Sequence, residues 1–183
     1  VGIDTIPEAV TASQMRFPRE QYPNMQFRLL DANRLPFRRE FDAVVGRFML
    51  MYAPEPVETA AKLAECLRPG GVITFIEPDY TCVRQREHLP LYRRVQNLID
   101  IALQRIGADT GIGLNLYLIL RMAGLSDLEV RCNVAAGGGP NFAGYSLAAS
   151  LLALCMPTLE QIGTVDVADL NLETIEACLR AEV

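Results

Sequence analysis

The sequence predicts an α/β fold built on a doubly wound, mainly parallel sheet. Short apolar runs alternate along the first half of the chain with longer segments of helical periodicity. The run over residues 72–76 lacks the polar alternation of a half-exposed strand, so we expect helices on both of its faces. With 183 residues, half of them apolar, the chain has the size of one domain.

The first half supplies four expected strands and two expected helices. Val1 to Asp4 has the pattern of the end of a buried strand, and Pro7 opens a helix that continues to Arg16. The other expected strands cover residues 25–30, 41–45 and 72–76. The second helix covers residues 57–67, and a turn at residues 67–71 ends it.

The second half is expected to be mainly helical. Helical periodicity covers residues 89–106, 114–123, 145–162 and 172–183. One further strand is expected at Leu128 to Val134. The loop at residues 135–144 contains Gly137, Gly138 and Gly139, and we interpret it as a connector that could serve as a lid.

Charge and composition exclude several classes of protein. The net charge is −5, and no basic run extends beyond pairs of arginines, which argues against a nucleic-acid partner and favours a small molecule. The five cysteines are widely spaced and the chain has one histidine, so we expect free thiols and no metal site. No segment has the length of a membrane span or the layout of a signal peptide, which predicts a soluble, cytoplasmic protein.

Two expected strands end in a carboxylate. Asp4 follows the first strand and could accept hydrogen bonds from both hydroxyls of a ribose. Asp31 follows the second strand and could accept from an adenine amino group, while the neighbouring backbone N–H donates to the ring. The alternatives are a helix cap for Asp4 and a turn-forming residue for Asp31.

Four motifs now resemble the class I S-adenosylmethionine-dependent methyltransferases, in particular the small-molecule group that includes the ubiquinone and menaquinone biosynthesis enzymes. They are G-I-D-T-I-P-E-A at Gly2–Ala9, L-L-D-A-N-R-L-P-F at Leu29–Phe37, F-D-A-V-V-G-R at Phe41–Arg47 and L-R-P-G-G-V-I-T-F-I-E-P-D at Leu67–Asp79. The resemblance covers residues 1–79. It implies a Rossmann-like methyltransferase sheet, S-adenosyl-L-methionine as cofactor, and methyl transfer to a small-molecule acceptor.

The resemblance also implies roles for individual residues. Asp4 would bind the ribose hydroxyls, with Thr5 and Ile6 against the adenine face. Asp31 and Ala32 would recognise the adenine edge. Gly46 and Arg47, just past the third strand, would border the methionine moiety, although Arg47 could instead form a structural salt bridge.

The sequence departs from the family at both ends. The acidic-G-x-G-x-G loop and its strand, which belong before Val1, are absent, and only the first partner of the C-terminal antiparallel strand pair is recognisable. We therefore expect one truncated methyltransferase domain, with a cofactor-binding part over residues 1–79 and acceptor-side helices plus a C-terminal strand over residues 80–183. We also expect that this chain alone neither folds stably nor methylates an acceptor.

Catalysis of methyl transfer depends mainly on alignment of the acceptor and exclusion of water, so a dedicated base is not always required. The candidates for a base are Glu77 and Asp79, which follow the strand over residues 72–76, and His88. Two rival classes remain open, a nicotinamide-dinucleotide-binding protein and a non-catalytic binding module.

Overall fold

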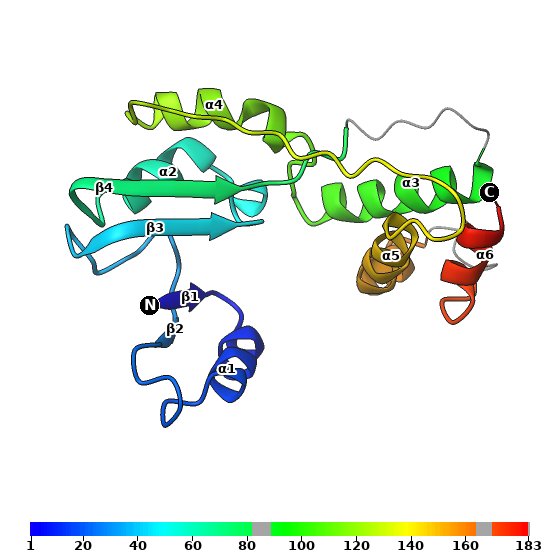
Figure 1. Cartoon of the computed structure of the whole chain (residues 1–183), viewed down its shortest axis with the longest axis horizontal. Helices are drawn as coiled ribbons and strands as arrows, with labels where there is room; N and C mark the ends of the chain where they lie inside the picture. Colours follow the sequence, from blue (N-terminus) through cyan, green and yellow to red (C-terminus); the bar gives the residue numbers. More distant parts are fainter. Residues whose placement is uncertain (82–88, 164–169, 183) are drawn as a thin grey trace. The chain divides into compact units, whose positions relative to one another are not determined.

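The computed structural model describes residues 1–81, 89–163 and 170–182 (Figure 1). The chain forms two compact units. The first, here called the sheet unit, contains Val1–Ile76 and Leu116–Leu128. The second, here called the helical unit, contains Glu77–Asn115 and Glu129–Val183. The expectation of a single domain divided after residue 79 stays a prediction.

The sheet unit begins with a parallel strand pair and one helix. Strand β1 (Gly2–Asp4) pairs with β2 (Phe27–Leu29), and Asp4 lies opposite Leu29. Helix α1 (Pro7–Arg16) connects the two strands and packs against both, with Val10 buried (Figure 1). Proline suits the first turn of α1 because the N–H that it lacks has no partner there in any helix.

A second parallel pair, β3 (Phe41–Arg47) and β4 (Leu67–Ile76), follows in the same unit (Figure 1). The short 3-10 helix η1 (Leu50–Tyr52) and helix α2 (Pro56–Ala64) connect the two strands. Leu50 and Ala60 on this connection are fully buried. They contribute to the core of the sheet unit together with Leu63 and Phe75.

The expected turn at residues 67–71 is a bulge within β4, and this corrects the sequence prediction. Leu67 already pairs with Phe41, and the register shifts before Ala43 meets Val72. Gly70 adopts a φ of 81°, which favours glycine. The preceding helix therefore ends at Ala64 rather than at residue 67, because the residues after it join the ladder.

The prediction that helices cover both faces of residues 72–76 is wrong for the described residues. Val72 and Ile76 are 64% and 54% exposed, whereas Phe75 is only 8% exposed. Alternate residues of a strand point to opposite faces, so one face of β4 is packed and the other is open to solvent in the described parts of the chain.

The coarse fold prediction is confirmed, since the sheet unit is a mixed α/β structure with parallel strands. The four strands form two two-stranded sheets, and β1 and β3 share no ladder in the described residues. The doubly wound sheet expected from the sequence requires a strand between these two. That part of the fold, with the expected truncation, stays a prediction.

The helical unit is built on α3 (Pro90–Arg105), α5 (Gly144–Gln161) and α6 (Ile175–Ala181). Helix α3 packs along α5, and α5 packs against α6. The fully buried side chains include Val95, Leu152, Leu159 and Leu179. Helix α4 (Ile112–Met122) begins in this unit and continues into the sheet unit.

A carboxylate from the end of the chain caps helix α3. The two side-chain oxygens of Glu182 accept hydrogen bonds from the backbone N–H groups of Leu91, at 2.6 Å, and Tyr92, at 3.0 Å. These N–H groups lie in the first turn of α3, where no helical carbonyl is available to them. The negative charge also suits the positive end of the helix dipole.

Glu176 joins α5 to α6 through a shared oxygen. Its Oε1 accepts hydrogen bonds from the Ser146 hydroxyl at 2.7 Å and from the Arg180 guanidinium at 2.6 Å. The Ser146 hydrogen bond, with Arg180 second, lowers the pKa of the Glu176 carboxyl from its ordinary value. Arg180 also donates to the carbonyl of Pro140, which attaches the end of the glycine-rich loop to α6.

The prediction of a strand at Leu128 to Val134 is wrong, because these residues belong to no strand. Val130 and Val134 are 51% and 78% exposed. Extended backbone becomes a strand only when a neighbour completes the ladder, and none of the described residues does so here. In the part of the chain that the structure describes, no helix is long and apolar enough to cross a membrane.

Candidate cofactor site

Asp4 lies at the carboxyl end of β1 with an exposed side chain. Its Oδ1 accepts a hydrogen bond from the backbone N–H of Ile6 at 2.9 Å. Ile6 is the residue before the first turn of α1, and α1 has no side-chain cap. Asp4 therefore orders the turn that enters the helix without capping it, and its Oδ2 makes no hydrogen bond in the described residues.

Thr5 and Ile6 form the exposed turn between β1 and α1. Ile6 is 56% exposed, which places an apolar side chain two residues after the Asp4 carboxylate. An exposed apolar side chain beside a hydrogen-bond acceptor suits a ligand with a flat apolar face and a polar edge.

Asp31 forms a tight turn directly after β2. Its Oδ1 accepts from the backbone N–H of Asn33 at 2.8 Å, and its carbonyl accepts from Arg34 at 2.9 Å. The turn-forming alternative for Asp31 is therefore part of its role. The backbone N–H of Ala32, between these bonds, has no hydrogen-bond partner in the described residues.

Asn33 is a residue of this site that the sequence interpretation missed. Its Oδ1 lies 2.8 Å from the hydroxyl of Thr59, which is 1% exposed on α2. This contact holds the loop that carries Asp31 and Ala32 against α2. A polar residue two positions after Asp31 is a weak signal, because no local pattern pairs it with a threonine 26 positions along the chain.

The structure brings Asp4 and Asp31 to the same edge of one sheet. Strands β1 and β2 are parallel neighbours, and Asp4 lies opposite Leu29, two residues before Asp31. Carboxyl ends of parallel strands meet at one edge, where ligands of open α/β sheets bind. The two predicted recognition residues therefore lie at the ends of neighbouring strands.

Gly46 and Arg47 are the last residues of β3, not residues past it as the sequence predicted. Gly46 is buried, and a Cβ at this position would lie 2.6 Å from Cδ1 of Phe75. The close approach of the Phe75 ring explains why this position is a glycine. The pairing of Arg47 with Ile76 extends the ladder beyond the apolar run.

Arg47 makes no ion pair with any residue that the structure describes, so the salt-bridge alternative has no support there. Its guanidinium carbon lies 4.5 Å from the centroid of the Phe48 ring. Phe48 adopts a φ of 50°, a left-handed conformation that is uncommon for a bulky residue. The chain thus turns sharply at the end of β3, and such strained positions concentrate at functional sites.

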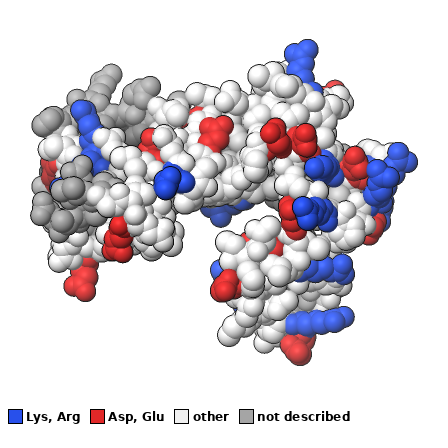
Figure 2. All heavy atoms as spheres, turned by 180° about the vertical axis from the view of Figure 1, so that it is seen from behind, with Lys and Arg blue, Asp and Glu red and all other residues white. Residues whose placement is uncertain are grey.

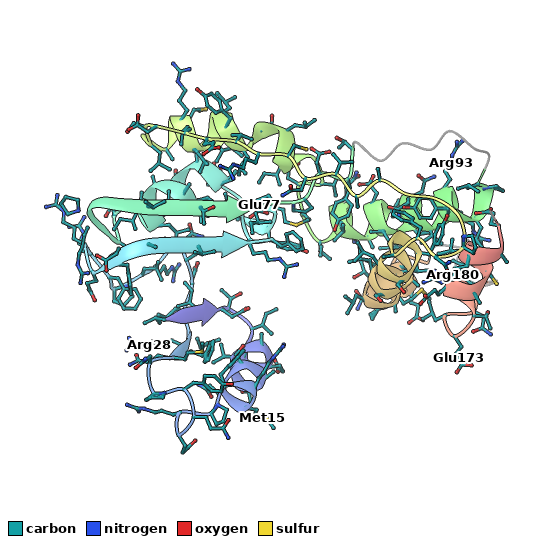
Figure 3. All side chains as sticks on the ribbon, in the orientation of Figure 1. Met15, Arg28, Glu77, Arg93, Glu173 and Arg180 are labelled. Atoms are coloured by element: carbon teal, nitrogen blue, oxygen red, sulfur yellow. The ribbon has the colours of Figure 1, made fainter. Side chains whose placement is uncertain are left out.

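The candidates for a catalytic base belong to the helical unit or lie outside the described residues. Glu77 directly follows β4 (Figure 3). His88 lies outside the described residues. Neither the role of Glu77 nor that of His88 is tested, and both stay predictions.

The carboxylate of Asp79 is used to connect two segments of the helical unit. Oδ1 accepts from the N–H and the hydroxyl of Thr81, at 2.9 and 2.6 Å. Oδ2 accepts from the N–H of Leu114 in the first turn of α4, at 3.2 Å. A Cβ on Gly113 would lie 3.0 Å from that of Asp79, so the segments approach closely. A structural role accounts for Asp79 more directly than proton transfer does.

The geometry defines a class of protein. Asp4 ends β1, Asp31 follows β2 by two residues, and the two parallel strands end at a common edge where one carboxylate oxygen and one backbone N–H are available. This is the arrangement of an α/β protein with parallel strands, and such proteins bind their ligands at this edge of the sheet.

Comparisons with known proteins give a family match for the first part of the chain. Residues 1–75 match the family model described as a methyltransferase domain. This match supports the resemblance of the four motifs to class I S-adenosylmethionine-dependent methyltransferases. A methyltransferase domain implies a methyl donor of the S-adenosylmethionine type.

Individual relatives match less than half of the chain. An uncharacterized protein of Mycobacterium tuberculosis strain H37Rv, Rv1405c, is 35% identical over 83 residues, which cover 45% of this chain and 29% of the relative. The Mycobacterium bovis protein Mb1440c matches with the same values. The aklanonic acid methyltransferase DauC of Streptomyces sp. strain C5 is 29% identical over 80 residues, or 43% of this chain and 36% of that enzyme. The matched part thus spans about a third of the length of these relatives.

Proposed function

We propose that the protein transfers a methyl group from S-adenosyl-L-methionine to a small-molecule acceptor. The observation that carries this proposal is the pair Asp4 and Asp31 on neighbouring parallel strands, within a segment that matches a methyltransferase domain. The unused Oδ2 of Asp4 is an acceptor for ribose hydroxyls, and the unused N–H of Ala32 is a donor for the adenine ring. Both groups fit the adenosyl half of the cofactor.

The proposed contacts with the cofactor come from the ends of three strands. Asp4 binds the ribose diol, and the exposed Ile6 beside Thr5 packs on the adenine face. Asp31 and Ala32 recognise the adenine edge from a turn that Asn33 attaches to α2. Gly46 and Arg47 border the methionine moiety from the end of β3.

The proposed reaction depends more on alignment of the acceptor with the methyl group than on proton transfer. S-adenosylmethionine supplies a methyl group on a sulfonium, which an acceptor attacks in line. The contribution of the chain is then to hold the adenosyl group at the sheet edge and to keep water from the reacting atoms. A base is needed only where the acceptor is a hydroxyl or carbon acid, and Glu77 and His88 remain the candidates for it.

The acceptor is proposed to be a small molecule on the strength of one named relative. DauC is named for methylation of aklanonic acid, and it is 29% identical to this chain over 80 residues. Aklanonic acid is therefore a sensible first member of an acceptor panel for methylation assays.

We expect the protein to bind S-adenosylhomocysteine and not NAD. The carboxylates of Asp4 and Asp31 and the N–H of Ala32 match the ribose and adenine of S-adenosylhomocysteine. Nothing in the four motifs requires a dinucleotide. Calorimetric titration with each ligand measures this directly. Tight NAD binding without a response to S-adenosylhomocysteine would favour the nicotinamide alternative, and no response to either would favour a non-catalytic module.

Replacing Asp4 should weaken cofactor binding without a matching loss of stability. In Asp4→Asn the side-chain carbonyl can still accept from the N–H of Ile6, but the charge that strengthens bonds to the ribose is lost. We expect S-adenosylhomocysteine affinity to fall by about 1.5–3 kcal/mol, roughly tenfold to a hundredfold, in both Asp4→Asn and Asp4→Ala.

Two measurements separate this role from a turn-forming role. Thermal melts should show Asp4→Asn close to the wild type, and His88→Ala should change affinity less than either Asp4 variant. If Asp4→Asn bound S-adenosylhomocysteine as the wild type does, the carboxylate would serve only the turn before α1.

A further inference from the structure

Residues 14–39 are positively charged in an otherwise acidic chain. This segment has six arginines and two acidic residues, whereas the whole protein has a net charge of −5. The arginines are Arg16, Arg19, Arg28, Arg34, Arg38 and Arg39. Figure 2 shows positively charged side chains along one side of the lower lobe, which contains β1, β2 and α1.

An open depression lies in the same region, between the end of α1 and the start of β2. Its volume is about 500 Å³, within the range of small-molecule sites. It is lined by Gln14, Phe17, Arg19, Met25, Gln26, Phe27 and Arg28. Phe27 is the first residue of β2, the strand that leads to Asp31, so the depression lies at the opposite end of β2 from the proposed cofactor site.

Two aromatic rings form an ordered apolar surface in the depression. The rings of Phe17 and Phe27 are stacked, with centroids 5.9 Å apart and planes at 25°. The Nε2 of Gln14 donates to the carbonyl of Phe27 at 3.2 Å, which ties α1 to the strand beside these rings. The Phe27 ring also occupies the space that a Cβ on Gly2 would need. A flat apolar group could stack on this surface.

Within the described residues, the guanidinium groups around the rings form no ion pair with a carboxylate. Arg19 makes no ion pair or hydrogen bond within the described part of the chain. Arg28 projects from β2 (Figure 3) and donates only to the neutral Oε1 of Gln26, at 3.1 Å. Arg16 lies with its guanidinium carbon 5.5 Å from the centre of the Phe17 ring. Cations that are not neutralised by a carboxylate and lie beside an apolar surface favour a ligand that is both flat and anionic.

We propose that this depression binds a small planar anion, such as an aromatic carboxylate, with its ring on Phe17 and Phe27 and its charge at Arg19 and Arg28. The site is separate from the proposed cofactor site, and the inference does not depend on the proposed function. Arginine suits the charged end because its planar fork matches a carboxylate in geometry.

The test is a titration of the full ¹⁵N-labelled protein, followed by amide chemical shifts, with 1-naphthoate and with 1-naphthalenemethanol. The two probes share a ring and differ in charge. We expect the acid to bind at least tenfold more tightly than the alcohol and to shift amides of residues 14–28. Arg19→Gln and Arg28→Gln should each weaken 1-naphthoate binding several-fold.

Arg105→Gln, an arginine at the end of α3 in the helical unit, is the matched control and should bind 1-naphthoate as the wild type does. Saturating S-adenosylhomocysteine should leave the affinity unchanged. Equal affinity for acid and alcohol, unchanged binding by Arg19→Gln, or competition with S-adenosylhomocysteine would each overturn the proposal.

Discussion

Leu152→Ala is expected to lower the free energy of unfolding by about 2–5 kcal/mol. Leu152 is completely buried in α5, the helix that packs along α3 and against α6. Truncation removes apolar contacts and leaves a cavity that surrounding helices fill only in part. Because whole domains are stable by only about 5–15 kcal/mol, a change of this size should be evident in urea unfolding followed by circular dichroism.

Leu154 provides a matched control on the same helix. It is 77% exposed, so Leu154→Ala removes the same atoms from solvent rather than from a core. We expect its unfolding midpoint to lie within experimental error of the wild type. Similar losses in the two variants would mean that α5 does not bury the face assigned to Leu152.

Gly46→Ala is expected to destabilise the sheet unit, although alanine in an unobstructed strand would stabilise it by roughly 0.5–1 kcal/mol relative to glycine. The added Cβ would lie 2.6 Å from Cδ1 of Phe75 and 2.9 Å from Sδ of Met49. Phe75 is buried and cannot move without displacing its neighbours. Overpacking of this kind costs about 1–3 kcal/mol, which outweighs the gain.

A double-mutant cycle identifies the cause. In a Phe75→Leu background the ring is absent, so Gly46→Ala should cost less than it does in the wild type. Gly138→Ala is the control, because a Cβ there meets no atom within 4 Å. An equal effect of Gly46→Ala in both backgrounds would contradict the packing explanation.

The helices could be predicted from the sequence because their signals are local. Periodicity predicts α3 and α5 to within a residue of their observed ends. The strands depended on partners that periodicity does not reveal. Residues 128–134 have the composition of a strand but no ladder, and the bulge at Gly70 follows from pairing with β3 rather than from the local sequence.

The candidate site shows the same division between local and distant information. Asp4 and Asp31 could be identified because each acid directly follows a short apolar run. The contact of Asn33 with Thr59 joins residues 26 positions apart, and that of Asp79 with Leu114 joins residues 35 positions apart. Neither pair has a motif of its own, so the sequence does not predict these contacts, and the role of Asp79 as a base stays a prediction.

The cap on α3 has a consequence for the order of events during synthesis. Glu182 follows Leu91 by 91 positions, and ribosomes add about 5–20 residues per second. The first turn of α3 is therefore synthesised roughly 5–18 s before the carboxylate that caps it. Until then water must accept the hydrogen bonds of its N–H groups, and the nascent helix lacks its cap. The helical unit can reach its final form only after nearly all of its chain has been translated.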